Sequence, residues 1–301
     1  MDKKIMIDTV AAYCQIHGLP VAHPLVTVVD TSQAQKHAPA GNYTFSYGVY
    51  ALFLKDAKCG DLIYGRQPYD YQEGTVVSFA PGQVVSFHYE PQSAPRACGL
   101  LFHPDLIHGT SLGRNIRQYH FFSYSSREAL HLNDEERDLF RSLLGQVSDE
   151  LRRQADGHTL RLVSRHIELL LDYCLRFYER QFTTRTRANK DILEKLEDVL
   201  DAYFSQGLAV RDGLPSVKYL AEQCFLSPNY FGDLVKRETG RTPQEYIQRK
   251  IVDLAKHALL DRNRTVKEIA YGLGFSYPQH FNRYFKRNVG VSPTEYRRRA
   301  V

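Results

Sequence analysis

The sequence predicts an α+β protein with an N-terminal β-barrel, a helical hairpin and a C-terminal all-α domain built from two helix-turn-helix units. Three observations predict this order: short β-rich runs between Leu25 and Tyr124, helical periodicity from Asn133, and a doubled helical pattern after Leu214. The chain has 301 residues, 43% of them hydrophobic and 24% charged, a composition typical of proteins that form a core. We expect domains at 1–130 (barrel), 131–182 (helical segment) and 191–301 (helix-turn-helix), with a linker at 183–190.

Six short runs rich in β-branched and aromatic residues fill the N-terminal part. They are LVTVVD, YTFSYGVYALFL, TVVSFAPG, QVVSFHYE, CGLLFH and QYHFFSY, separated by Pro and Gly. Several short strands at this spacing predict a small antiparallel barrel or sandwich.

Apolar residues recur at helical spacing after Asn133. One stretch carries Leu139, Leu143 and Val147. The next, after a break at Gly157, carries Leu160, Val163, Ile167, Leu170, Leu171 and Cys174. These stretches predict an antiparallel helix pair, which either forms a dimer interface or packs on its own barrel. A further helix is expected from about Asp191 to Ser205.

The C-terminal part contains one pattern twice. An offset of fifty residues superposes Phe231, Lys236, Arg237, Gly240, Pro243, Glu245 and Tyr246 on Phe281, Lys286, Arg287, Gly290, Pro293, Glu295 and Tyr296. Each copy predicts a short helix, a turn and a second helix, which Ser227 or Ser276 can cap and Gly240 or Gly290 can end. A capping box with proline opens the next helix in both copies, and the first box begins a bridging helix from Pro243 to Leu260.

This doubled pattern resembles the DNA-binding domain of the AraC/XylS family of bacterial transcription regulators, over about Leu214 to Arg299. The second copy carries the family signature most fully, in Ile269-Ala270, Gly274-Phe275-Ser276, Phe281, Phe285-Lys286, Gly290, Ser292-Pro293 and Tyr296-Arg297. The resemblance implies a cupin-like N-terminal barrel that binds a small-molecule effector, and the segment Gly74 to Gly82 looks like part of one. It also implies a homodimer formed through the helical segment, with double-stranded DNA and RNA polymerase as further partners.

The positive charge of the chain lies in the same C-terminal part. Residues 211–301 contain 17 Lys and Arg against 9 Asp and Glu, a net charge of +8, whereas the rest of the chain has a net charge of −3. This asymmetry indicates that only the C-terminal domain meets a polyanion such as DNA.

The helical wheel selects the residues expected to touch DNA. With Phe281 and Phe285 inward, the adjoining face of the second copy is a polar stripe. The first copy has Gly232 and Asp233 on the corresponding face, so we expect its second helix to make weaker contacts with bases. The expected base contacts are Asn229, Asp233, Gln279, His280, Asn282 and Arg283. The expected phosphate contacts are Ser227, Tyr230, Lys236, Arg237, Thr242, Ser276, Lys286 and Arg287. For Tyr230 partial burial is an equal alternative, and for His280 an exposed position without DNA contact.

The sequence leaves three possible functions for the barrel. Phe45, Tyr47, Phe87 and His88 are candidate effector-binding residues, although aromatic residues at alternating positions also form barrel cores. In the second reading the barrel holds no ligand and serves dimerisation or protein contact. The third is a cupin-type metalloenzyme, which the sequence disfavours because Glu90 stands where the second histidine of an H-x-H pair would be.

Other site classes have little support in the sequence. The five cysteines are scattered without a C-x-x-C pair, so we expect neither a disulfide framework nor a zinc ribbon. We expect no cofactor, no metal and no catalytic site. No apolar run approaches membrane-spanning length, and the expected location is the cytoplasm.

Overall fold

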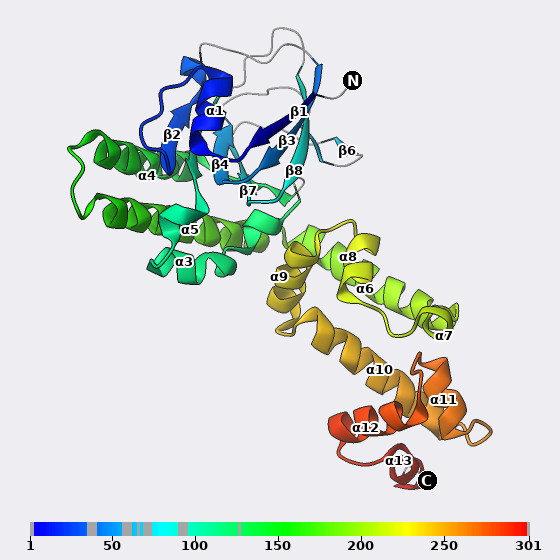
Figure 1. Cartoon of the computed structure of the whole chain (residues 1–301). Helices are drawn as coiled ribbons and strands as arrows, with labels where there is room; N and C mark the ends of the chain where they lie inside the picture. Colours follow the sequence, from blue (N-terminus) through cyan, green and yellow to red (C-terminus); the bar gives the residue numbers. More distant parts are fainter. Residues whose placement is uncertain are drawn as a thin grey trace. The chain divides into compact units, whose positions relative to one another are not determined.

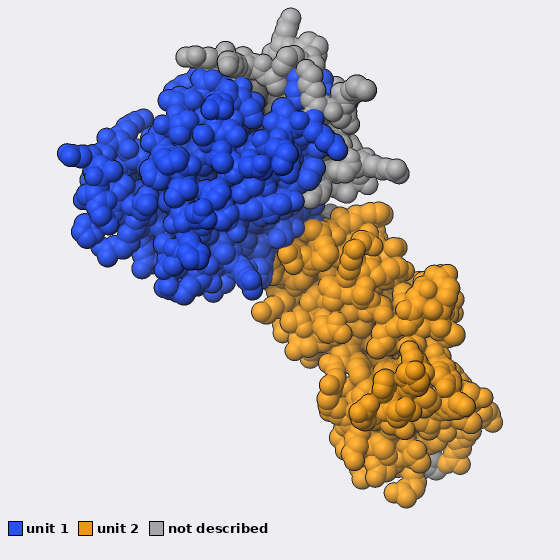
Figure 2. Space-filling model, viewed as in Figure 1, with its two compact units in different colours: residues 1–184 blue, residues 185–301 orange. Residues whose placement is uncertain are grey.

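The computed structural model describes residues 3–34, 41–55, 62–64, 67–68, 74–89, 96–125 and 128–299. The chain divides into two compact units, residues 1–184 and 185–301 (Figures 1 and 2). The division falls inside the segment 183–190 that we expected as a linker, but most of this segment is helical. Helix α5 (Thr159–Thr184) and helix α6 (Thr186–Ser205) are separated by Arg185 alone.

The described strands of unit 1 form two five-stranded sheets. The sheet orders are β1-β3-β8-β5-β6 and β10-β7-β4-β9-β2. The strands are β1 Lys3–Ile7, β2 Val26–Asp30, β3 Gly41–Tyr47, β4 Tyr50–Lys55, β5 Leu62–Tyr64, β6 Gln67–Pro68, β7 Thr75–Phe79, β8 Val84–Tyr89, β9 Ala97–Phe102 and β10 Leu130–His131. Neighbouring described strands pair antiparallel, except that β1, which the sequence did not predict, runs parallel to β3.

Side chains from both sheets share one core. Strand β3 alternates, with Tyr43, Phe45 and Tyr47 buried and the residues between them more exposed, as the period of two in a strand requires. Phe53 of β4 and Phe79 of β7 belong to the same buried cluster. The α+β prediction is confirmed, with two facing sheets enclosing an aromatic core.

The run QYHFFSY, which we expected as a strand, folds instead as two 3₁₀ turns, Ile116–Gln118 and His120–Ser123. Phe121 and Phe122 are adjacent and both buried. The ring of Phe121 stacks on Tyr178 of α5, and the ring of Phe122 packs edge to face on Tyr50 of β4.

The helices of unit 1 are α1 Val10–His17, α2 Pro104–Ile107, α3 Ser111–Asn115, α4 Asp134–Arg152 and α5 Thr159–Thr184. The predicted pair, α4 and α5, pack against each other, and each also contacts strands of the second sheet. The expected inward residues from Val163 to Cys174 of α5 are buried. Leu160, which we also expected inward, is exposed, and Phe140 and Leu144 are buried in α4.

Unit 2 consists of helices (Figure 1). They are α6 Thr186–Ser205, α7 Leu208–Asp212, α8 Val217–Gln223, α9 Pro228–Thr239, α10 Pro243–Leu260, α11 Val266–Gly272, α12 Pro278–Val289 and α13 Pro293–Arg299. The bridging helix α10 has the predicted bounds because its signals are local: Thr242 and Glu245 form the predicted capping box. Within the described residues of the whole chain, no helix combines the length and the apolar character needed to cross a bilayer.

The ends of the second helices are partly as predicted. Gly240 and Gly290 adopt left-handed conformations, with φ of 70° and 85°, and end α9 and α12. Ser227 caps α9, since its side chain accepts a hydrogen bond from the backbone N–H of Tyr230. Ser276 does not cap α12: the capping position is Tyr277, which makes no side-chain capping hydrogen bond within the described residues.

Candidate nucleic-acid interface and interior pocket

Helix α12 has a buried aromatic face and an exposed polar face. Phe281 and Phe285 are fully buried. Their rings contact Phe275 and Tyr296 edge to face, with centroids 5.3 and 5.5 Å apart. The opposite side of the helix carries the predicted stripe of Gln279, Asn282, Arg283 and Lys286, all exposed. His280 and Arg287, beside the stripe, are exposed too. The buried rings fix the rotation of α12, so this stripe has a defined direction.

Hydrogen bonds join α12 to α10, and α13 to the end of α10 and the turn that follows it. The hydroxyl of Tyr284 donates to the backbone carbonyl of Gln248 in α10, at 3.3 Å. Arg297 of α13 donates to the carbonyls of Leu259, at 2.9 Å, and Arg264, at 2.8 Å. The stripe is therefore carried by a packed scaffold, the arrangement that positions side chains for recognition.

The second helix of the first copy, α9, offers a weaker surface. Asn229, Lys236 and Arg237 are exposed, whereas Asp233 is half-buried. Tyr230, which we assigned to a phosphate contact, is only 4% exposed and lies in the core of unit 2. The structure thus favours the alternative of burial for Tyr230.

The turns that precede α9 and α12 differ. Phe225 has a φ of +60°, unusual for a bulky residue, and is 64% exposed, with the amine of Lys195 3.9 Å from its ring centroid. The equivalent residue of the second copy is Gly274, with a φ of +89°. A Cβ at Gly274 would lie 2.8 Å from the carbonyl oxygen of Ala209. Phe225 and Gly274 occupy equivalent positions when the two copies are aligned. This difference in residue type could have predicted from the sequence that the two turns differ in structure.

A polar cluster that sequence reasoning missed joins α6 to the bridging helix. The amine of Lys250 lies 3.0 Å from Glu197 and 2.8 Å from Asp201, and the hydroxyl of Tyr246 donates to Glu197. Burial and this hydrogen bond raise the pKa of Tyr246 to about 12. Helix α6 is therefore held against α10 as a part of unit 2.

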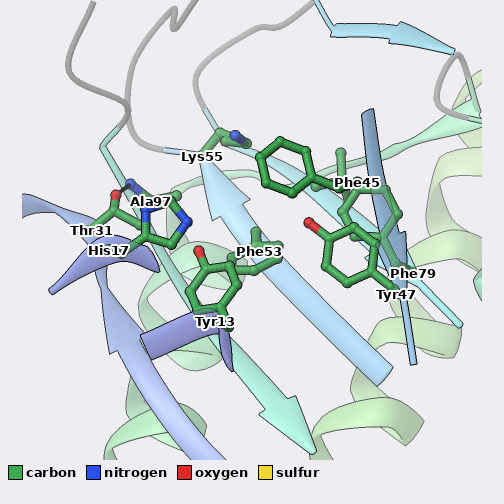
Figure 3. Close-up of a pocket in the computed structure, with 10 residues that line it drawn as sticks. Tyr13, His17, Thr31, Phe45, Tyr47, Phe53, Lys55, Phe79 and Ala97 are labelled. Carbon is green, nitrogen blue, oxygen red and sulfur yellow. Dashed lines mark hydrogen bonds between the residues drawn. The ribbon is translucent and has the colours of Figure 1, made fainter. Parts of the chain in front are cut away.

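An interior pocket lies between the two sheets of unit 1. It is lined by Tyr13, His17, Thr31, Phe45, Tyr47, Phe53, Lys55, Val77, Phe79 and Ala97 (Figure 3). Of the predicted effector-binding residues, Phe45 and Tyr47 line this pocket, and the side chains of Phe87 and His88 lie outside the described part of the structure. The contributions of helix α1 and of Lys55 were not predicted.

The described residues do not assemble a metal-binding group. No cluster of three or more His, Cys, Asp or Glu side chains suited to a metal occurs among them. The Nδ1 atom of His103 accepts a hydrogen bond from the backbone N–H of Asp105, at 3.2 Å. Glu90 lies outside the described residues.

Two family models match the chain. Residues 220–299 match a helix-turn-helix domain, and residues 60–170 match an AraC-like ligand binding domain. Among curated proteins, the chain is 31% identical to the probable transcriptional regulator LumQ of Photobacterium leiognathi over 156 residues, which cover 51% of this chain and 58% of LumQ. It is 38% identical to the transcriptional activator RhaS of Escherichia coli strain SE11 over 78 residues, 26% of this chain and 28% of RhaS. The chain thus spans little more than half of LumQ and less of RhaS.

Among solved structures, part of this chain is similar to the C-terminal domain of the two-component response regulator yesN from Fusobacterium nucleatum. The sequence identity is 26% and the TM-score 0.30, over 34% of this chain and 96% of that chain.

Proposed function

We propose that this chain, which belongs to the AraC/XylS family of transcription regulators, regulates transcription by binding specific DNA sequences through unit 2. The observation that carries the proposal is the exposed polar stripe of α12, which stands on the buried rings of Phe281 and Phe285. A helix of this kind fits the major groove, where side-chain donors and acceptors distinguish all four base pairs.

The side chains divide by chemistry into two roles. Arg283 can pair with both acceptors of a guanine, and Gln279 and Asn282 can each pair with an adenine, so these residues and His280 are the proposed base readers. Lys286 and Arg287, in the last turn, are proposed to bind phosphates, which position the domain without reading sequence.

Helix α9 is proposed to position the domain more than to read bases. Asn229 and the half-buried Asp233 are its candidate base contacts, and Lys236, Arg237, Ser227 and Thr242 its candidate phosphate contacts. Ser276 is a further proposed phosphate contact, on the turn before α12.

The repeat suggests that one chain addresses two successive major grooves. Helix α10 has 18 residues, so it is about 27 Å long at ~1.5 Å per residue. Successive major grooves are roughly 34 Å apart. If α10 sets the separation of α9 and α12, either the duplex bends toward the protein, at a free-energy cost of about 1 to 6 kcal/mol, or only α12 inserts fully into its groove. We favour the bend.

Unit 1 is proposed to sense a small effector in its interior pocket, which the match to a ligand binding domain supports. The alternative is a unit that binds no ligand and serves dimerisation or protein contact. Leu162 and Leu169 of α5 are each 42% exposed and lie two turns apart, so they favour α5 as the surface for a homodimer. RNA polymerase is a further proposed partner. We assign the chain no catalytic activity, because the matched families are DNA-binding and ligand-binding ones, and we expect it in the cytoplasm with its DNA.

The test begins with enrichment of a random duplex pool by the purified full chain. Dissociation constants are then measured on the enriched duplex and on a scrambled one, for the wild type, Arg283→Ala and the control Arg152→Ala, which removes an exposed arginine from unit 1. Arg283→Ala is expected to cost about 1 to 3 kcal/mol on the enriched duplex and less on the scrambled one. Equal losses on both duplexes would refute base reading by Arg283.

A further inference from the structure

We propose that Tyr277, at the start of α12, is a further specificity-determining residue, whose ring contacts the 5-methyl group of a thymine. This inference rests on the proposed function and deepens it, because it names one base and the atom by which that base is read. Among the four DNA bases only thymine presents a methyl group in the major groove, and apolar side chains recognise it by direct contact.

Tyr277 is an insertion in the second copy of the repeat. In the first copy Ser227 is followed directly by Pro228, the first residue of α9. In the second copy Tyr277 stands between Ser276 and Pro278, the first residue of α12. The insertion therefore moves Ser276 away from the capping position and puts an aromatic ring there.

The insertion costs α12 a stabilising contact that α9 keeps. The side chain of Ser227 caps α9, and serine is among the residues preferred at this position. Tyr277 occupies the same position in α12 and makes no side-chain capping hydrogen bond within the described residues. Tyr277 is also 55% exposed, so the burial of its ring does not offset the loss of the cap. A residue that local stability disfavours is expected where function selects it.

The ring of Tyr277 lies beside the residues proposed to read bases. It contacts the ring of His280 edge to face, with centroids 5.3 Å apart, and its backbone carbonyl accepts a hydrogen bond from the N–H of His280 at 3.0 Å. His280 and Arg283 are three residues apart, so they are neighbours on one side of the helix. Tyr277, His280 and Arg283 therefore follow one another along that side of α12.

This position suits contact with a base. In a helix-turn-helix, the N-terminal residues of the second helix are the ones that reach base edges. An exposed ring that covers a methyl group removes apolar surface from water on both sides. At ~1.5 Å per residue, Tyr277 lies about 9 Å along α12 from Arg283, and stacked base pairs are about 3.4 Å apart. We therefore expect the thymine within about three base pairs of the guanine assigned to Arg283.

Replacement of a thymine by deoxyuridine removes the methyl group alone and leaves the hydrogen-bonding atoms of the base in place. Single base-pair changes in the enriched duplex, compared between the wild type and Arg283→Ala, first identify the guanine. Dissociation constants of the full chain are then measured on duplexes that carry deoxyuridine at one thymine at a time. At one thymine in the expected window, loss of the methyl group should weaken binding about fourfold, the value for burial of one methyl group.

Three variants assign this methyl contact to a side chain. Tyr277→Ser should bind the thymine and deoxyuridine duplexes equally, and it should fold, because serine suits the capping position. Tyr277→Phe should keep the wild-type preference for thymine, because the ring and not the hydroxyl makes the contact. Tyr271→Ser, which removes a tyrosine of α11 that is 42% exposed, is the matched control and should keep the preference too.

The proposal is overturned if the enriched duplex has no thymine in the expected window, or if no thymine there responds to the loss of its methyl group. It is also overturned if Tyr277→Ser keeps the preference for thymine, if Tyr277→Phe loses it, or if Tyr271→Ser loses it as fully as Tyr277→Ser. Each of these results leaves sequence-specific binding by unit 2 intact. A chain that enriches no duplex at all would contradict the proposed function together with this inference.

Discussion

Substitution of Gly274 by alanine should destabilise the second helix-turn-helix unit far more than the same substitution at Gly290. Both glycines have positive φ, +89° and +85°, so alanine is strained at either position by roughly 1 to 2 kcal/mol. At Gly274 the new Cβ would also lie 2.8 Å from the oxygen of Ala209 and 2.9 Å from the carbonyl carbon of Gly213. At Gly290 no described heavy atom lies within 4 Å of such a Cβ.

The two variants therefore differ by the overlap with the backbone of α7 and the turn after it. Overpacking of this kind costs about 1 to 3 kcal/mol. Replacing glycine by alanine also lowers the conformational entropy of the unfolded chain, which stabilises the folded state by about 0.4 to 1 kcal/mol. This gain is the same in both variants and cancels in the comparison. The expected losses of stability are then about 1 to 5 kcal/mol for Gly274→Ala and about 0 to 1.6 kcal/mol for Gly290→Ala, and the two differ by the overlap of about 1 to 3 kcal/mol.

Native-state hydrogen exchange of the full chain, read on peptides from α11 and α12, measures this difference locally. An overlap term of about 1 to 3 kcal/mol corresponds to exchange roughly 5 to 150 times faster in Gly274→Ala than in Gly290→Ala. Equal exchange in the two variants would refute the close approach of Gly274 to α7. It would also remove the reason we give for glycine in one copy and phenylalanine in the other.

Three further outcomes are expected. In urea unfolding followed by circular dichroism, Phe225→Ala should be less stable than Phe225→Gly by about 1 kcal/mol. Both variants lose the contact with Lys195, but only glycine adopts the positive φ without strain. The opposite order of stability would contradict a strained backbone at Phe225. Hydrogen bonds from the backbone and side chain of Ser292 lower the pKa of Glu295, so its stabilisation is complete above the ordinary glutamate pKa and is lost as pH falls through the lowered value. Melting curves should therefore show Glu295→Gln destabilised at neutral pH, by a difference from the wild type that shrinks as the pH falls below the ordinary glutamate pKa. A difference that stays constant with pH would contradict this linkage. Circularly permuted probes carrying one bound site should migrate differently according to site position, whereas uniform mobility would exclude the bend inferred from the length of α10.

The sequence predicts unit 2 well because its signals are local. A capping box, a proline and apolar spacing set the bounds of α10, and none of these depends on residues far away in the chain. The exposure of the α12 stripe follows from the burial of Phe281 and Phe285, which the helical wheel can identify.

The features that sequence reasoning missed depend on tertiary contacts. Lys250 and Glu197 are 53 residues apart, so no local pattern pairs them. Lys55 ends a strand, a position that usually faces solvent, and only the closure of the sheets places it in the lining of a pocket. The burial of Tyr230 depends in the same way on how α9 packs within unit 2.

Hydroxyl-radical footprinting of the enriched duplex by the full chain tests most directly the claim that the repeated helix-turn-helix is a DNA-reading device. At a measured stoichiometry of one chain per site, we expect two protected windows on one face of the duplex, about one helical turn apart, with α9 and α12 in successive major grooves. Replacement of Arg283 by alanine should weaken protection in one of these windows first. Protection of a single groove by one chain would contradict the two-groove account, and the absence of any protected window would contradict DNA reading by unit 2 altogether.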